Sequence, residues 1–171
     1  MDDSCVVSFA DLRSSKEEWI KKNSREPMIE EYIDGREFTV PFLCCKTLPV
    51  CEVTYEDYPE GKPKILAQAA KWQPDSFESK HTGSLYDFCA GDTPMIVELQ
   101  YLAERCIRIF HLNGWGRIDF RVKIDGYEFS PYIIDVNANS CLAQDAWFAG
   151  SLERAGITMD QAIQQILLDT Q

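Results

Sequence analysis

The sequence contains no apolar run near the roughly 20 residues that a helix needs to cross a bilayer. Its first residues also lack the basic and then apolar pattern of a signal peptide. Positive charge is scarce, because 17 lysine and arginine residues stand against 28 acidic ones, for a net charge of -11. An acidic surface repels nucleic acids and anionic membranes, so we expect neither as a general partner.

Cysteine and histidine are present without the spacing that a zinc site or a disulfide framework requires. The cysteines number seven, an odd count, and only two histidines accompany them. Cys106 falls within a helical apolar pattern, which is typical of a small buried residue. We therefore expect reduced thiols and a cytoplasmic location. His81 and His111 are interpreted as structural or surface residues.

Several common catalytic motifs are missing. The chain has no GxxxxGK[ST] loop and no GxGxxG fingerprint, which argues against P-loop and Rossmann nucleotide sites. No arrangement of serine or cysteine with histidine suggests a covalent nucleophile. With 171 residues, of which 45% are hydrophobic and 12% aromatic, the chain is expected to form one globular domain over 1–171.

Hydrophobic periodicity predicts the secondary structure of the first half. Amphipathic spacing indicates a helix at 8–22, and further patterns indicate strands at 28–33, 37–43 and 48–55. Asp34-Gly35 is a turn signal that would join the first two strands into a hairpin.

The second half begins with a long segment, 56–92, that is rich in proline and glycine and has little periodicity, which is typical of a functional loop. The clearest helix is predicted at 94–112, with Thr93 as its cap. Two further helices are predicted at 142–155 and 159–168.

The most informative stretch is 116–137. Its first part alternates apolar residues with charged ones that include Arg117 and Asp119, which predicts a strand with one charged face. Asp135 and Asn137 share a face of the following apolar run, and their oxygens together with that of Asp119 would suit Mg2+. The alternation is also the pattern of any half-solvated strand, so that interpretation stays open.

The register of these two strands decides whether the acids can meet. A two-residue turn at Asp125-Gly126 would place Asp119 and Asp135 on opposite faces, so a shared metal requires a loop of odd length or a bulge. Pro131 cannot donate a hydrogen bond within a ladder. We therefore predict an irregular loop at 125–131, with Asp119 opposite Asp135.

Four segments in order resemble ATP-grasp enzymes, specifically the D-alanine–D-alanine ligase group. Glu30–Val40 resembles the nucleotide hinge of that group and Ala70–Trp72 its mobile-loop lysine, while Gly114–Asp119 and Asp135–Asn137 resemble its metal-binding strands. The resemblance implies an α+β fold, the C-terminal subdomain of an ATP-grasp enzyme, in which helices flank an antiparallel sheet. It also implies that the N-terminal substrate domain and the first ATP subdomain are lacking.

The resemblance further implies an ATP- and Mg2+-dependent carboxylate–amine ligase that works through an acyl phosphate, or the catalytic half of one, with Mn2+ as an alternative ion. The implied nucleotide-binding residues are Glu30, Glu31, Tyr32, Ile33, Glu37 and Lys71. The implied metal ligands are Asp119, Asp135 and Asn137. Arg117 and Lys71 would supply positive charge to the phosphates during transfer.

Two positions depart from the pattern of the family. Asp135 stands where glutamate is usual and is one methylene shorter, and residues 138–141 lack the usual proline. The lack of the N-terminal half and the change at Asp135 leave an alternative open: a degenerate, non-catalytic module that binds nucleotide or a partner protein. The expected partners are small carboxylate and amine substrates, and a second chain or the missing N-terminal half. The oligomeric state stays open.

Overall fold

The computed structural model describes residues 7–66, 70, 73 and 75–169. Its internal contacts divide the chain into two compact units, which are described separately. The first unit comprises 1–33 and 57–82, and the second comprises 34–56 and 83–171. No helix within the described ranges is long and apolar enough to span a membrane.

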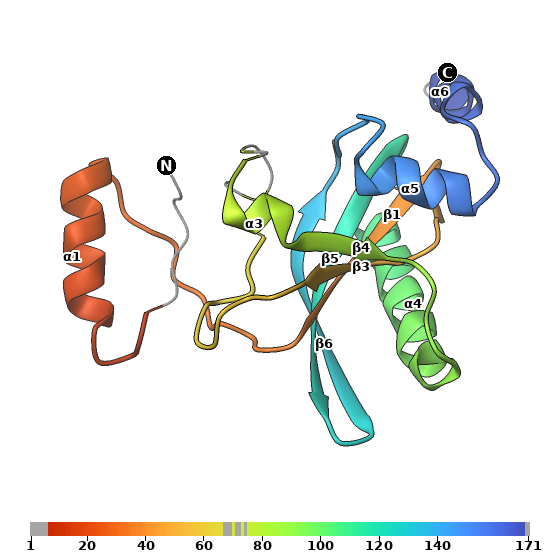
Figure 1. The fold of residues 1–171 in the computed structure, drawn as a ribbon. Helices are drawn as coiled ribbons and strands as arrows, with labels where there is room; N and C mark the ends of the chain where they lie inside the picture. Colours follow the sequence, from red (N-terminus) through yellow and green to blue (C-terminus); the bar gives the residue numbers. More distant parts are fainter. Residues whose placement is uncertain (1–6, 67–69, 71–72, 74, 170–171) are drawn as a thin grey trace. The chain divides into compact units, whose positions relative to one another are not determined.

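The first unit contains α1 (Leu12–Asn23) and the short helix α3 (Phe77–Lys80) (Figure 1). The Ser76 hydroxyl caps α3 by accepting from the Ser79 amide at 3.0 Å. None of the described residues of this unit is buried, and Phe9 and Met28 are 93% and 83% exposed. The predicted inward face of α1 is thus at most half-buried.

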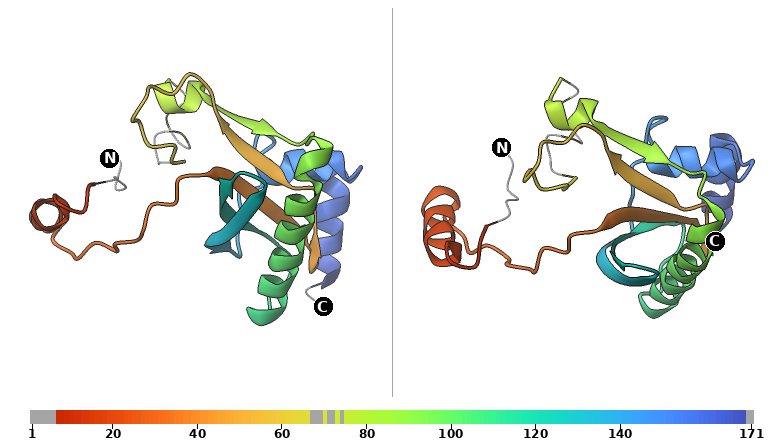
Figure 2. Two further views of the ribbon diagram at one scale, coloured as in Figure 1. Left: turned by 90° about the horizontal axis from the view of Figure 1, so that it is seen from below. Right: turned by 60° about the horizontal axis from the view of Figure 1, so that its bottom comes forward.

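The second unit is built on a sheet with the strand order β4-β3-β1-β5-β6, and a short β2 pairs with β1 (Figures 1 and 2). The β1 strand pairs antiparallel with β2, β3 and β5, and β5 pairs antiparallel with β6. The strands are β1 (Arg36–Leu43), β2 (Lys46–Thr47), β3 (Cys51–Tyr55), β4 (Thr82–Leu85), β5 (Trp115–Asp125) and β6 (Glu128–Asn137).

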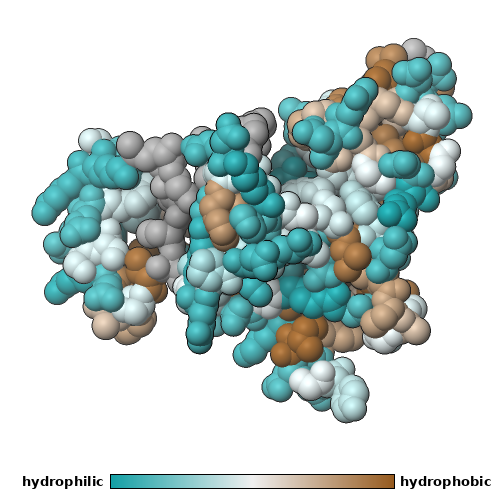
Figure 3. Space-filling view, viewed as in Figure 1, coloured by the Kyte–Doolittle hydropathy of each residue, from teal (hydrophilic) through white to brown (hydrophobic). Residues whose placement is uncertain are grey.

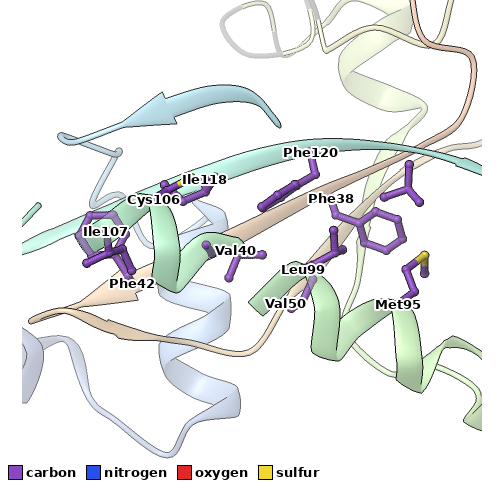
Figure 4. Packing of buried hydrophobic residues seen from close by; sticks show 12 residues of the cluster. Phe38, Val40, Phe42, Val50, Met95, Leu99, Cys106, Ile107, Ile118 and Phe120 are labelled. Carbon is purple, nitrogen blue, oxygen red and sulfur yellow. The ribbon is translucent and has the colours of Figure 1, made fainter. Parts of the chain in front are cut away.

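One face of this sheet is covered by α4 (Thr93–Ile109), which follows a short 3-10 turn, η1 (Ala90–Asp92). The helix inserts Met95 and Leu99 among strand residues that include Phe38 and Phe120 (Figure 4). Alternation along β1 and β5 explains this layer, because every second side chain of each strand points toward α4. The prediction of a helix in the 94–112 segment is confirmed, although Thr93 is the first helical residue rather than the cap.

Two further helices, α5 (Trp147–Arg154) and α6 (Met159–Asp169), form a second cluster with the end of β1. Phe148 and Leu152 of α5 pack there with Leu43 and with Ile166 of α6. In Figure 3 the visible face of the molecule is mainly hydrophilic, as expected from its net charge of -11. The structure confirms the predicted α+β class, an antiparallel sheet with flanking helices.

Three predicted features of local structure are wrong. Residues 28–33 form no strand, so the hairpin at Asp34-Gly35 does not exist, and β1 pairs instead with strands from later in the chain. The predicted loop at 125–131 is a tight hairpin, in which Asp125 pairs with Glu128 and Val122 with Pro131. Proline is tolerated there because β6 is the last strand of the sheet order, where a backbone N–H on the outer side needs no partner strand.

Candidate functional site

The polar face of the sheet is centred on Asp119. On β1 its cross-strand partner is Thr39, and on β6 its partner is Asp135. Arg117 in turn pairs with Asn137. Residues directly opposite each other in a ladder share a face, so these five side chains lie on one side of the sheet. The prediction that Asp119 lies opposite Asp135 is confirmed.

The register that achieves this depends on one unpaired residue. Phe120 pairs with Ile133, whereas Asp119 pairs with Asp135, so the register shifts by one residue at Ile134. This is a β-bulge, in which two residues of one strand oppose a single residue of the other. The sequence argument required an odd loop or a bulge, and the structure contains the bulge rather than the loop.

Arg117 and Asp119 form a close ion pair on this face. The Arg117 Nε atom lies 3.0 and 2.9 Å from the two carboxylate oxygens of Asp119. The Nη2 atom of Arg117 lies 3.9 Å from Oδ2 of Asp135. The side chains of Arg117 and Asp119 are 14% and 13% exposed, while that of Asp135 is 54% exposed. The arginine thus faces both acids, and Asp135 is the one open to solvent.

Burial raises the pKa of the Asp119 carboxyl above its ordinary value, and the nearby charge of Asp135 acts in the same direction. The Arg117 charge and the neighbouring Thr39 hydroxyl oppose that rise. The Thr39 hydroxyl is buried opposite Asp119, without a hydrogen bond of good geometry to any residue that the structure describes. Burial of the Asp119 carboxylate costs free energy, so this acid requires a positive partner.

Asn137 is held by its own loop. Its side-chain oxygen Oδ1 accepts a hydrogen bond from the Asn139 amide at 2.9 Å. Ser140, which follows Asn139, is buried, and its carbonyl accepts a hydrogen bond from the Trp115 indole N–H at 2.9 Å. These bonds hold Asn137 and Ser140 in place.

The donor set on this face suits a hard cation. Within the described part of the chain, no three histidine, cysteine, aspartate or glutamate side chains converge closely enough to enclose an ion. Magnesium, however, usually binds one or two protein carboxylates and completes its shell with water and substrate phosphates. Asp119, Asp135 and the amide of Asn137 fit that mode of binding.

Glu37 lies on the same face but is engaged within the sheet. Its Oε2 atom accepts from the Tyr55 hydroxyl at 2.5 Å and lies 3.1 Å from the Arg121 guanidinium. Arg121 also donates to the Gly35 carbonyl at 2.9 Å. Glu37 is 7% exposed and Arg121 5% exposed. A ribose hydroxyl would therefore have to compete with two internal donors for this carboxylate.

The remaining predicted residues belong to the first unit. Glu30 and Glu31 are exposed, Tyr32 and Ile33 are half-buried, and all four lie in a segment without regular structure. Lys71 lies outside the described residues. The second unit therefore brings together the other five predicted residues on one sheet face: Glu37, Arg117, Asp119, Asp135 and Asn137.

Sequence reasoning missed the contacts that three residues make with this site. Alternation along β5 predicted that Arg121 shares the face of Arg117 and Asp119, but not its ion pair with Glu37. Tyr55 gave no such signal, because its contact with Glu37 depends on the pairing of β1 with β3. Trp147 was interpreted only as part of a helix, yet its ring lies 5.7 Å from the guanidinium carbon of Arg117.

The sequence is similar to curated ligases over nearly its whole length. It is 27% identical over 163 residues to D-alanine–D-alanine ligase B of Clostridium perfringens, covering 95% of this chain and 48% of that protein. It is 29% identical over 164 residues to D-alanine–D-alanine ligase of Haemophilus influenzae, covering 95% of this chain and 49% of that protein. The chain thus spans about half the length of these relatives.

The fold is also found in solved structures. The structure of D-alanine–D-alanine ligase from Bacillus anthracis complexed with ATP superposes with a TM-score of 0.66 at 18% identity, over 96% of this chain and 47% of that one. D-alanyl-alanine synthetase A from Vibrio cholerae matches with a TM-score of 0.61 at 21% identity, over 82% of this chain and 40% of that one. A family model described as the D-ala D-ala ligase C-terminus matches residues 4–168. The chain therefore belongs to the D-alanine–D-alanine ligase C-terminal family, with an ATP-grasp fold.

Proposed function

We propose that this chain is the C-terminal catalytic part of an ATP- and Mg2+-dependent carboxylate–amine ligase, with residues 1–171 as one ATP-grasp domain. The observation that carries the proposal is the convergence of Arg117, Asp119, Asp135 and Asn137 on one sheet face. That face presents two acids and an amide beside an arginine, which is a suitable set for a metal–nucleotide complex.

Each residue of this set has a distinct role in the proposal. Asp119, Asp135 and Asn137 would hold Mg2+, which when bound neutralises charge on the nucleotide phosphates. Arg117 would donate to phosphate oxygens through the guanidinium nitrogens that do not contact Asp119. Lys71, outside the described residues, would add a second positive charge.

The nucleotide base and sugar would bind nearer the start of the domain. Glu30, Glu31, Tyr32 and Ile33 would line the adenine, and Glu37 would accept from the ribose hydroxyls. The Tyr55 hydroxyl and the Arg121 guanidinium fix the direction of the Glu37 carboxylate, and a ribose hydroxyl would compete with them for its oxygens.

The chemistry proposed for these groups has two steps. A substrate carboxylate attacks the γ-phosphate of ATP, forming an acyl phosphate and releasing ADP. An amine then attacks the acyl carbon, and inorganic phosphate leaves as the amide forms. The chain supplies charge and position rather than a covalent nucleophile.

A complementary polypeptide, matching the N-terminal half of the relatives, would complete the site. The first unit supports this, because none of its described residues is buried and several of its large apolar side chains are exposed. Apolar surface of this kind is typical of an interaction site. The substrates would be a small carboxylate and a small amine.

A second candidate is a module that binds nucleotide or a partner without catalysis. It is favoured by the internal engagement of two key acids. Glu37 is bound to Tyr55 and Arg121, and Asp119 is bound to Arg117. Under this interpretation nucleotide binding would be weak and independent of Mg2+.

Binding of a fluorescent ATP analogue to the 171-residue chain, with and without MgCl2, separates the two candidates. The ligase proposal predicts binding that requires Mg2+ and is weakened about tenfold or more by Asp119→Asn. Asp125→Asn, at the exposed end of the same strand, is the matched control and should have no effect. Mg2+-independent binding that Asp119→Asn leaves intact would favour the module and contradict the ligase.

A further inference from the structure

Arg117 is held from two sides, by the carboxylate of Asp119 at its Nε edge and by the indole ring of Trp147. We propose that Trp147 is a positioning residue that fixes the Arg117 guanidinium for phosphate binding. This inference rests on the proposed function, because it assigns Trp147 to the same anion site. The sequence pattern alone places Trp147 only within a helix predicted at 142–155.

The contact between Trp147 and Arg117 joins two separate elements. Trp147 is the first residue of α5, whereas Arg117 lies within β5. The guanidinium carbon lies 5.7 Å from the ring centroid, which is within the range of a cation–π contact. A guanidinium can stack by its flat face while its N–H groups remain available in its plane for carboxylates and phosphates.

Trp147 is itself fixed by residues in and next to β4. Its indole N–H donates to the Ser84 hydroxyl oxygen at 3.1 Å, and the Tyr86 hydroxyl donates to its backbone carbonyl at 3.4 Å. Gly150 allows Tyr86 to pack closely on α5, since a Cβ there would come within 2.1 Å of the Tyr86 hydroxyl. The ring therefore has a fixed place, as a residue that orients another side chain requires.

The physical consequence concerns side-chain freedom rather than charge. Arg117 has a long side chain whose immobilisation costs conformational entropy. With the ring in place, the Arg117 side chain is already ordered in the unliganded protein, and its guanidinium is oriented toward Asp119 and Asp135. Without the ring, a bound phosphate would have to order the side chain, and its affinity would fall although the charge is unchanged.

The first test is a double-mutant cycle that measures ATP binding by calorimetry in the presence of MgCl2. Trp147→Phe keeps an aromatic face and should stay within about twofold of the wild-type affinity, whereas Trp147→Leu should lose about threefold to tenfold. In an Arg117→Met background, Trp147→Leu should have no further effect, because its role acts through Arg117. An equal loss in both backgrounds would overturn the proposal.

The matched control is Tyr101→Leu on α4, which removes another cation–π contact, 5.9 Å from Arg105, at a half-exposed surface position. It should leave ATP affinity unchanged. Thermal unfolding of each variant shows whether it is folded. If Trp147→Leu is folded and binds ATP as the wild type does, the inference falls while the proposed function stands.

The second test needs no nucleotide. The Arg117 Nε–H proton, bonded to Asp119, is observed by NMR, and its exchange with solvent is compared among the variants. Exchange should be slow in the wild type and in Trp147→Phe and several-fold faster in Trp147→Leu; equal rates would overturn the inference. Failure of every variant, the wild type included, to bind ATP would count against the proposed function, and the exchange rates would still decide the role of Trp147.

Discussion

Asp119 pairs directly with Asp135 across the β5–β6 ladder, although the hairpin that joins these strands would by itself place them on opposite faces. The unpaired Ile134 shifts the register by one residue and turns Asp135 and Asn137 toward Asp119 and Arg117. The candidate metal site therefore depends on a local irregularity of one strand and not on the length of a loop.

The length of the side chain at position 135 should control metal-dependent nucleotide binding. Asp135 is half exposed and lies 3.9 Å from Arg117, so an added methylene has room to extend toward solvent and an ion. Asp135→Glu should tighten binding of ATP in the presence of Mg2+ by a few fold, and Asp135→Ala should weaken it about tenfold. Calorimetric titration measures both, with Asp125→Glu as a control at the hairpin end. Tighter binding by Asp135→Ala would contradict the metal role.

The buried ion pair between Glu37 and Arg121 should matter greatly for stability. Arg121→Met would remove the positive partner of the buried Glu37 carboxylate, at an expected cost of about 3–5 kcal/mol in the free energy of unfolding. Tyr55→Phe removes one hydrogen bond and should cost about 1–3 kcal/mol. Urea unfolding measures both changes.

The control for this pair is Arg108→Met. Arg108 and Glu104 form an exposed pair at 3.9 Å on α4, so its loss should change the free energy of unfolding by less than about 0.5 kcal/mol. A cost for Arg121→Met as small as that of the control would show that Glu37 is not held as described.

Stability at low pH should depend on Asp92. The Arg36 guanidinium, which donates to both Asp92 oxygens, lowers the pKa of that carboxyl below its ordinary value. The resulting stabilisation is fully present above the ordinary pKa near 3.8 and is lost as the pH falls through the lower, folded-state pKa. The melting temperature of Asp92→Asn should thus be lower than that of the wild type at pH 6, and the difference should shrink below pH 4. A constant difference down to pH 2 would contradict this assignment.

Gly116, next to Arg117, should tolerate no side chain. A Cβ at this position would lie 2.4 Å from the Asn137 carbonyl oxygen and 2.5 Å from the Phe42 ring. Gly116→Ala should therefore destabilise the protein by about 1–3 kcal/mol and displace Asn137, which weakens nucleotide binding. Gly91→Ala, where the nearest contact is an ordinary 3.6 Å, is the matched control in unfolding and binding assays.

Much of the second unit could be predicted from the sequence, because its signals are local. The alternation in β5 predicted that one face of the strand is apolar and the other charged, and the apolar spacing predicted α4. The position of Asp135 was also predicted, because two acids near one ion must share a face.

The errors arose where distant pairing decides structure. The segment 28–33 has the composition of a strand, but no strand of the described chain pairs with it. Pro131 suggested a break, but a proline fits the last strand of the sheet order. The partners of Glu37 and Arg117, namely Tyr55 and Trp147, are brought in by other elements, which no local pattern could have revealed.

Paramagnetic NMR tests most directly whether this face binds a metal–nucleotide complex. Mn2+ with ATP replaces Mg2+ as the probe, and the broadening of individual signals reports proximity to the ion. The account predicts strong broadening at the Asn137 side-chain amide, the Asn139 amide and the Arg117 Nε–H, with a sharp Arg36 Nε–H on the opposite face of the sheet. Sharp Asn137 signals, or broadening spread evenly over the acidic surface, would contradict it.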